Sequence, residues 1–305
     1  MSRAPFVLLA VGLVLGAAYD RLPTRPVVTR AGYRVLAGDF HAHTRFSDGF
    51  LGPWDLVLHA RRRGLDVVGV TEHNQVFPGK LARAFSRAIG GPTVVVGEEI
   101  TFKEFHLIAL GLDRRIAPDA DVPTLVDRVH AQGGVAIAAH PAKQFWNAYE
   151  AARPRLDGTE LMHPVAYADP AGNRGFRWAD MREFYVRAHA EGMRMTPIGS
   201  SDYHGFSPLG LCRTYVFATR DDDAAVVDAI REGRTVVYDL SGKAWGRPDL
   251  VAALEKEPLP ERSTPVDDGY RAHGLLDAVG RICGLLGALG LVVFGRKRPV
   301  DGSTA

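Results

Sequence analysis

The chain has 305 residues, of which 46% are hydrophobic and 24% are charged, and its formal net charge is +2. This composition excludes general disorder, and the length allows one large domain or two smaller ones. The near-neutral charge gives no bulk electrostatic reason to bind nucleic acid, so no nucleic-acid partner is expected. Two cysteines, Cys212 and Cys283, are too few for a disulfide scaffold.

The N-terminus begins with an apolar run. Residues 4–19 carry no charge and follow Arg3. The run is short for a spanning helix and suits the apolar part of a signal peptide, with small residues at 16–18 for cleavage. We therefore predict that residues 1–19 are a signal peptide or an N-terminal membrane anchor. An apolar helix of a soluble domain is the third possibility. Residues 20–34, which contain two prolines and several arginines, are a predicted linker.

Strand and helix patterns then alternate as far as residue 240. Strands are expected at 33–40, 66–70, 93–96, 105–110, 135–139, 159–162, 196–198, 214–218 and 235–238, and helices at 53–63, 79–89, 122–132, 179–191 and 223–232. Such alternation predicts an α/β fold with a mainly parallel sheet and helices outside it. About seven strand–helix units within residues 35–240 favour a closed barrel over an open sheet.

Polar side chains gather where these strands end, which is the face on which barrels of this kind build active sites. His41 and His43 are two apart, so on a strand their rings point to the same face. The candidate metal ligands are His41, His43, Asp48, His73, Glu98 or Glu99, His106, His140, Asp202 and His204. Burying so many ionisable groups together is costly without a compensating cation. Histidine and carboxylate ligands without thiolate suit zinc, manganese or iron.

The order of these motifs resembles the PHP (polymerase and histidinol phosphatase) family of metallohydrolases. The series is His-x-His-Thr-x-x-Ser-Asp-Gly, Glu-His-Asn, Gly-x-Glu-Ile, a further histidine, His-Pro and Ser-Asp-x-His, and it covers residues 35–240. The sequence of residues 38–43 is most similar to that of the carbaryl hydrolase-like branch of the family. The resemblance implies a distorted, TIM-like (β/α)7 barrel that holds two or three divalent metal ions.

The resemblance also implies a distribution of the ligands, carried over motif by motif. It gives the first metal to His41, His43, Glu99 and Asp202, makes Glu99 a ligand shared with a second metal at His106 and His140, and gives the third to Asp48, His73 and His204. Glu98 and Glu99 face opposite ways on a strand, and Glu99 fills the bridging place in the Gly-x-Glu-Ile pattern.

Paired metal ions activate water and polarise a scissile phosphoryl or carbonyl group. The same metal core serves either bond, and phosphoester hydrolysis is the activity that we predict first. An amide, carbamate or ester hydrolase with the same metal core, or a metal-stabilised binding domain without turnover, are the alternatives. Asp48, Asp202 and His204 are candidates to relay a proton. Arg45, Lys143 and His163 are candidates to contact a small, anionic substrate.

The C-terminus turns apolar again. Residues 241–273 contain four prolines and are a predicted linker, and residues 274–295 are a predicted transmembrane segment, with an interfacial or hairpin segment as the alternative. The basic tail at 296–305 begins with Arg296-Lys297-Arg298. By the positive-inside rule we expect a membrane protein with its metal domain outside the cytoplasm.

Overall fold

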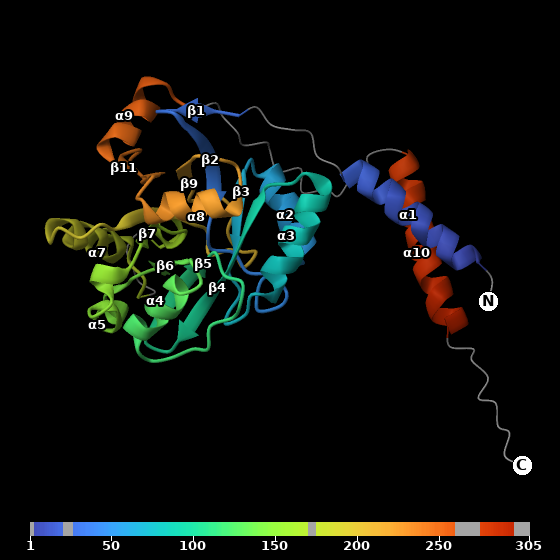
Figure 1. Cartoon of the computed structure of the whole chain (residues 1–305), viewed down its shortest axis with the longest axis horizontal. Coiled ribbons are helices and arrows are strands. Elements are labelled where there is room, and N and C mark those ends of the chain that lie inside the picture. The colour runs from blue at the N-terminus through green and yellow to red at the C-terminus, as the bar shows by residue number, and fades with distance from the viewer. Residues whose placement is uncertain (1–2, 21–26, 170–174, 260–274, 296–305) are drawn as a thin grey trace, which may run out of the picture. The chain divides into compact units, whose positions relative to one another are not determined.

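The computed structural model describes residues 3–20, 27–169, 175–259 and 275–295. It divides the chain into two compact units (Figure 1). The larger unit contains all the strands that the structure describes. The smaller unit contains helices α1 (Ala4–Asp20) and α10 (Leu275–Gly295).

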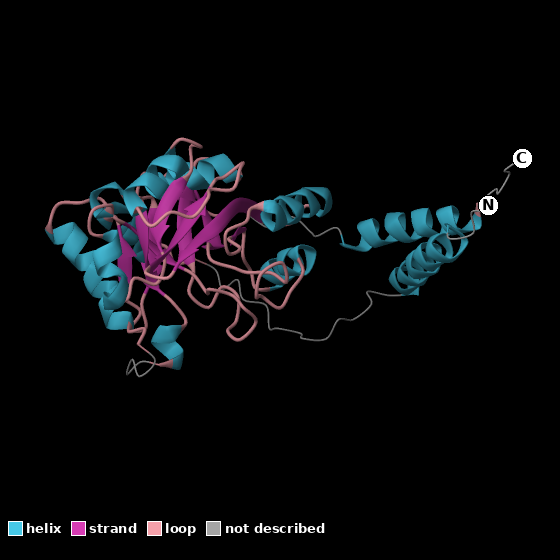
Figure 2. Ribbon diagram, turned by 90° about the horizontal axis from the view of Figure 1, so that it is seen from below, coloured by secondary structure: helices cyan, strands magenta, loops and turns pink. Residues whose placement is uncertain are grey.

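The larger unit is a mixed α/β domain with its strands in the middle (Figure 2). Its strands are β1 (Thr29–Arg30), β2 (Tyr33–Asp39), β3 (Val67–Val70), β4 (Thr93–Phe102), β5 (Phe105–Leu110), β6 (Val135–Ala138), β7 (Gly158–Met162), β8 (Thr196–Gly199), β9 (Thr214–Ala218), β10 (Thr235–Tyr238) and β11 (Ala244–Gly246). Its helices are α2 (Pro53–Arg62), α3 (Phe77–Ile89), α4 (Val122–His130), α5 (Trp146–Tyr149), α6 (Val165–Ala168), α7 (Trp178–Ala190), α8 (Asp223–Arg231) and α9 (Pro248–Lys256).

The strands form one sheet in the order β11-β10-β9-β2-β3-β4-β5-β6-β7-β8, with β1 paired to β2. Strand β10 also lies against β8, so the sheet curls into a nearly closed barrel. The predicted α/β barrel is thus confirmed in outline. The sheet is less parallel than predicted, because β4–β5, β5–β6, β2–β9, β9–β10 and β10–β11 are antiparallel. Only Lys103 and Glu104 separate β4 from β5, which suits a hairpin and is too short for a parallel crossover.

Helix α4 shows how the outer layer forms. Asp121 caps it by accepting a hydrogen bond from the Thr124 backbone N–H at 3.0 Å. Its buried face is made of Val122, Leu125, Val126 and Val129, the spacing that an amphipathic helix presents to a core. Gly133, with φ of +76°, then turns the chain back toward β6.

The region after β10 differs from the predicted linker. Strand β11 pairs antiparallel with β10, and Leu250 and Leu254 of α9 are buried in one cluster with Val35 and Phe217. The linker prediction is therefore wrong for β11 and α9. Residues 260–273 of that linker, and the basic tail at 296–305, lie outside the described residues.

Helices α1 and α10 pack closely through glycines. A Cβ on Gly12 would collide with the backbone of Gly284, and a Cβ on Gly287 would collide with the backbone of Leu9. Small residues allow two helix backbones to approach in this way. Within the part of the chain that the structure describes, no helix combines the length and the apolar character needed to cross a membrane. The transmembrane segment predicted at 274–295 is therefore not supported.

Candidate metal centre

The predicted ligands come together at one end of the sheet. His41 and His43 follow β2, His73 follows β3, His140 follows β6 and Asp202 follows β8. Glu99 lies within β4, and His106 lies on β5 opposite Thr101, so the hairpin places His106 diagonally across from Glu99.

Two of these residues have unusual backbone conformations. His140 and Asp202 have φ values of +26° and +43°, in the left-handed region that side chains other than glycine rarely adopt. Such a conformation costs on the order of 1–3 kcal/mol and persists where the surrounding structure enforces it. Both residues turn sharply at a strand end, and this turn brings their side chains into the centre.

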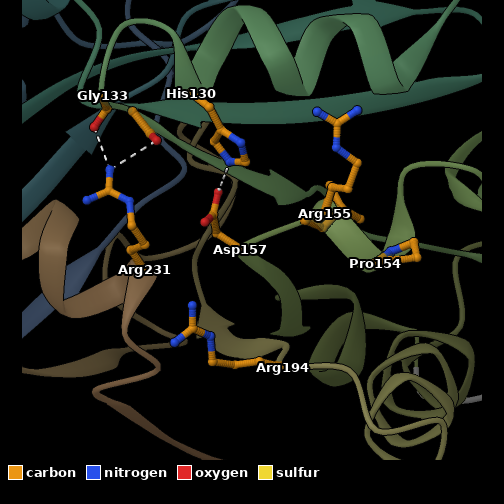
Figure 3. Close-up of a pocket in the computed structure, with 9 residues that line it drawn as sticks. His130, Gly133, Pro154, Arg155, Asp157, Arg194 and Arg231 are labelled. Atoms are coloured by element: carbon orange, nitrogen blue, oxygen red, sulfur yellow. Dashed lines mark hydrogen bonds and ion pairs between the residues drawn. The ribbon is translucent and has the colours of Figure 1, made fainter.

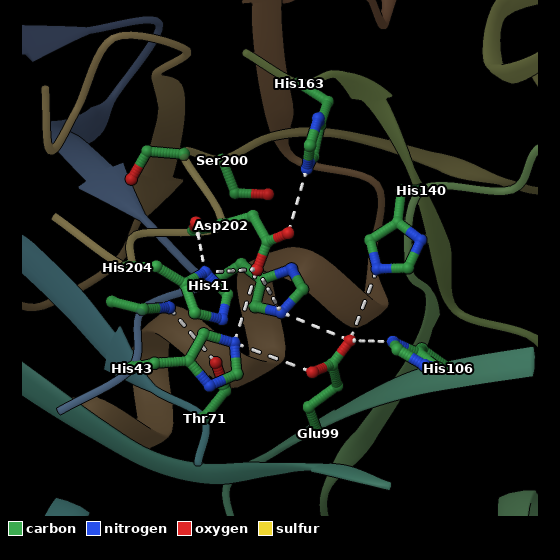
Figure 4. A network of polar contacts seen from close by, with 12 residues as sticks. His41, His43, Thr71, Glu99, His106, His140, His163, Ser200, Asp202 and His204 are labelled. Carbon is green, nitrogen blue, oxygen red and sulfur yellow. Dashed lines mark hydrogen bonds and ion pairs between the residues drawn. The ribbon is translucent and has the colours of Figure 1, made fainter. Parts of the chain in front are cut away.

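The first cluster is formed by His41, His43 and Asp202 (Figure 4). Asp202 Oδ1 lies 3.2 Å from His41 Nε2 and 3.3 Å from His43 Nε2. Both histidines are fully buried.

The second cluster is formed by Glu99, His106 and His140. Glu99 Oε1 lies 2.8 Å from His106 Nδ1 and 3.3 Å from His140 Nε2. The same carboxylate also reaches the first cluster, with Oε1 3.4 Å from His41 Nε2 and Oε2 3.5 Å from His43 Nε2. Glu99 therefore lies between the two clusters, where the motif comparison placed a bridging ligand.

The third cluster is formed by His43, Asp48, His73 and His204. Asp48 lies 3.3 Å from His73 Nε2 and 3.2 Å from His204 Nε2, and its side chain is 54% exposed. Its nearest approach to His43 is 3.8 Å, to Nδ1. His43 thus presents one ring nitrogen to each of two clusters, a sharing that the sequence did not predict.

These groups fit metal cations. The ligand atoms of each cluster lie within 4.8 Å of one another. Several of the buried atoms that face the centre make no hydrogen bond within the protein, namely His41 Nε2, both ring nitrogens of His43 and Glu99 Oε2. Buried polar atoms normally have partners, so unpaired nitrogens and carboxylate oxygens that converge on one space point to cations. The clusters are consistent with several metal ions and do not choose among zinc, manganese and iron.

The electrostatics keep the carboxylates ionised. Burial alone would raise the pKa of Glu99, but His41 and hydrogen bonds from His106 and His140 hold that pKa well below its usual range. Burial would likewise raise the pKa of Asp202, and His41 and His163 hold it well below its usual range. The ionised carboxylate is the form that binds a cation.

Sequence reasoning missed Glu160, a buried carboxylate on β7. Glu160 Oε1 lies 3.0 Å from His41 Nδ1, and Oε2 accepts a hydrogen bond from the His140 backbone N–H at 2.5 Å. Burial would raise the pKa of Glu160, but the neighbouring His41 lowers it to about 2. A carboxylate behind a metal-binding histidine fixes the ring orientation and its tautomer. The available signal was an acidic residue in the middle of a short apolar strand.

Asp39, at the end of β2, supports the same region from the other side. Its carboxylate accepts hydrogen bonds from the backbone N–H groups of Ser201 at 3.0 Å and Gly210 at 2.7 Å. Asp39 is fully buried. It therefore fixes the segment that carries Asp202 and His204 onto the end of β2, next to His41.

The three predicted substrate contacts are placed differently. His163 reaches the centre, with Nε2 3.2 Å from Asp202 Oδ2. The Nε of Arg45 donates to the Phe50 carbonyl at 2.5 Å and so closes the loop around Asp48. Lys143 lies 3.4 Å from Glu183. The structure therefore engages Arg45 and Lys143 in contacts outside the three clusters.

A cavity of about 540 Å³ at the opposite end of the barrel contains none of the predicted site residues (Figure 3). It is lined by Arg155, Arg194 and Arg231 and by the segments that precede β6, β7 and β8. Arg231 donates to the carbonyls of Gly133 and Gly134. These contacts give Arg231 a structural role, because they hold the turn between α4 and β6.

Comparison with known proteins identifies the fold. No family model matches the chain. An uncharacterized protein from Methanocaldococcus jannaschii is 29% identical over 117 residues, which are 35% of this chain and 68% of that protein. A crystal structure from Bacteroides vulgatus, of a two-domain protein "containing predicted PHP-like metal-dependent phosphoesterase", superposes with a TM-score of 0.60 at 23% identity, over 77% of this chain and 74% of that one.

The chain has a PHP-like fold. The resemblance that the motifs indicated is thus confirmed for the fold of the larger unit. An amidohydrolase from Chromobacterium violaceum matches at 14% identity with a TM-score of 0.46, over 68% of this chain and 99% of that one.

Proposed function

We propose that the chain is a metal-dependent hydrolase that cleaves a phosphoester of a small, anionic substrate. The observation that carries the proposal is the position of Glu99. One of its oxygens faces His106 and His140, and the other lies 3.5 Å from His43 Nε2 and 2.9 Å from His73 Nδ1. A single buried carboxylate that reaches every cluster suits neighbouring cations that act on one substrate. A purely structural site is closed and needs fewer ligands.

Divalent metal ions in such a site supply Lewis-acid polarisation of a phosphoryl oxygen and activation of water. The residues that would hold them are His41, His43, Asp48, His73, Glu99, His106, His140, Asp202 and His204. The protein itself contributes orientation: Glu160 fixes the His41 ring, and Asp39 fixes the segment that carries Asp202. Fixed ligands need no rearrangement when charge develops in the transition state.

Proton transfer is best assigned to His163. Its Nε2 faces Asp202 Oδ2, and its side chain is 13% exposed, so it borders the centre and still exchanges with solvent. It belongs to none of the three clusters. Asp48, Asp202 and His204, which the sequence also offered as proton relays, each lie in a cluster and suit the role of ligand better.

The test is a hydrolysis panel on the full chain with Mn²⁺ or Zn²⁺ added. The panel contains a phosphomonoester, a phosphodiester, an aryl ester and a carbamate. The His41→Ala, His43→Ala double variant should abolish turnover, whereas His130→Ala, a matched histidine on α4 beside Asp157, should leave it unchanged. Preferred cleavage of the ester or carbamate would replace the phosphoesterase proposal. Bound metal with no turnover of any substrate would instead indicate a binding domain.

A further inference from the structure

Four exposed phenylalanines lie on or directly after the loops that build the third cluster, with Phe77 as the first residue of α3. Phe46, Phe50, Phe77 and Phe206 are 45%, 59%, 56% and 89% exposed. Phenylalanine usually lies inside a protein, and a group of exposed apolar side chains marks a contact surface.

The rings are paired in a way that follows the cluster. Phe46 and Phe77 lie 6.1 Å apart, and Phe50 and Phe206 lie 6.0 Å apart, both edge-to-face at 76°. Phe46 and Phe50 flank Asp48, Phe77 follows His73, and Phe206 follows His204. One pair therefore joins the Asp48 loop to the start of α3, which follows His73, and the other joins it to the loop of His204.

Backbone contacts hold the pairs in place. Gln75 Nε2 donates to the Phe46 carbonyl at 2.7 Å. Gly205, with φ of +101°, leaves room for Phe50, whose Cβ would lie 2.7 Å from any Cβ at that position. The two aromatic pairs are thus fixed parts of the loops that carry Asp48 and His204.

Three of the four phenylalanines lie within two residues of a third-cluster ligand along the chain. Two extended residues span at most about 7 Å, so the backbones of Phe46 and Phe50 lie within that distance of Asp48, as Phe206 does of His204. Asp48 is the most exposed residue of the three clusters. The exposed ligand Asp48 and the exposed Phe46 and Phe50 are thus neighbours in the same loop.

We propose that these four rings form an apolar cradle for the organic part of the substrate. Resting on the proposed function, this makes the substrate a phosphoester of an apolar alcohol, such as an alkyl or aryl phosphate. An amphiphile of this kind complements a charged centre bordered by phenylalanines. A sugar would need hydrogen-bond partners that these rings do not supply.

The test compares two substrates with the same type of leaving group. Ethyl phosphate and n-octyl phosphate, the latter below its micelle concentration, both release a primary alcohol. Each buried methylene is worth about fourfold, so partial burial of the longer chain should raise kcat/KM at least about tenfold over ethyl phosphate. In the full-length Phe77→Ala, Phe206→Ala variant this ratio should fall to within about threefold. Val186→Ala, a 44% exposed apolar residue on α7, should keep it.

A second readout is independent of turnover. Calorimetric titration of the metal-loaded protein with n-octylphosphonate and ethylphosphonate should show the same preference and the same loss in the variant. If the double variant unfolds, Phe206→Ser alone serves, because Phe206 is 89% exposed.

The outcomes separate the two proposals. Metal bound without turnover of either phosphate would refute the phosphoesterase, and the phosphonate titrations would still decide on the cradle. Turnover with equal kcat/KM for both substrates, or a preference that survives in the double variant, would refute the cradle and leave the hydrolase standing. A wild-type dimer that the variant dissociates while the ratio stays the same would show that the rings join two copies of the chain.

Discussion

Replacing Glu160 with glutamine should weaken metal binding although every predicted ligand is kept. Glu160 is fully buried and contacts the Nδ1 of His41, the backbone N–H of His140 and the hydroxyl of Ser200. Glutamine keeps the shape but removes the charge and replaces one acceptor oxygen with a donor. The one amide oxygen could accept from only one of His41 Nδ1 and the His140 backbone N–H, and without the negative charge, so the His41 ring would be held less firmly with its Nε2 toward Asp202.

The expected loss of metal affinity follows from the contact between Glu160 and His41. A hydrogen bond to a charged group is worth about 1.5–3 kcal/mol. Loss of a carboxylate behind a metal-binding histidine costs roughly 10–100-fold in affinity, which is the same range in free energy. We expect Glu160→Gln to raise the Kd for Mn²⁺ or Zn²⁺ by about that factor.

The assay is competitive metal titration of the full chain, with thermal unfolding alongside it. Glu98→Gln is the matched control, because Glu98 is also buried and accepts from the Ile116 N–H at 2.6 Å, but faces away from the centre. The control should bind metal as wild type does. If Glu160→Gln also bound metal with wild-type affinity, the reasoning about His41 would be refuted.

Three further predictions concern the loops and the fold. A Cβ at Gly49 would collide with the carbonyl of His43. The Gly49→Ala variant should therefore displace the Asp48 loop and lose the ion of the third cluster. Mass spectrometry that found the full metal content in this variant would contradict the prediction. Burial raises the pKa of Glu98 from 4.5 to about 7, so the native state disfavours the charged form of this carboxyl group. The folded protein therefore loses free energy of unfolding as the pH rises from 4.5 through 7. In urea unfolding at pH 8, the free energy of unfolding of Glu98→Gln should therefore exceed that of wild type by up to about 3 kcal/mol. The same difference between variant and wild type at pH 5 and at pH 8 would show that the Glu98 pKa is not raised. Asp222 caps α8 by accepting a hydrogen bond from the Ala225 backbone N–H at 2.8 Å. The Asp222→Ala variant should therefore lose about 1 kcal/mol of unfolding free energy. An unchanged urea midpoint would argue against the cap.

The sequence predicted the position of the centre because each ligand follows or lies in a recognisable strand. Periodicity located β2, β6 and β8 to within two residues, and the structure brings their polar ends together. The sharing of His43 between two clusters was not predictable, because it depends on how the Asp48 loop folds back. Glu160 was missed for a similar reason: its role comes from the strand beside it, and one acidic residue in a strand carries little local signal.

The incorrect predictions, of a mainly parallel sheet and of a linker after β10, also have physical causes. The antiparallel hairpin of β4 and β5 was missed because the strand was predicted to end at residue 96, whereas residues 97–102 continue β4 almost to the start of β5. Prolines at 248 and 258 suggested a linker, but Pro248 is the first residue of α9, where the missing N–H costs nothing. Tertiary burial of Leu250 and Leu254 then stabilises a helix that the composition alone disfavoured.

The most direct test of the account is metal removal and return in the full chain. The protein would be treated with a chelator, freed of it by gel filtration, and assayed on its best phosphoester before and after addition of Mn²⁺ or Zn²⁺, with metal content measured in parallel. We predict that turnover disappears with the metal and returns as two or three ions rebind, and that the His41→Ala, His43→Ala variant recovers neither. Undiminished hydrolysis by the metal-free protein would contradict the central claim that these histidines and carboxylates act by holding metal ions.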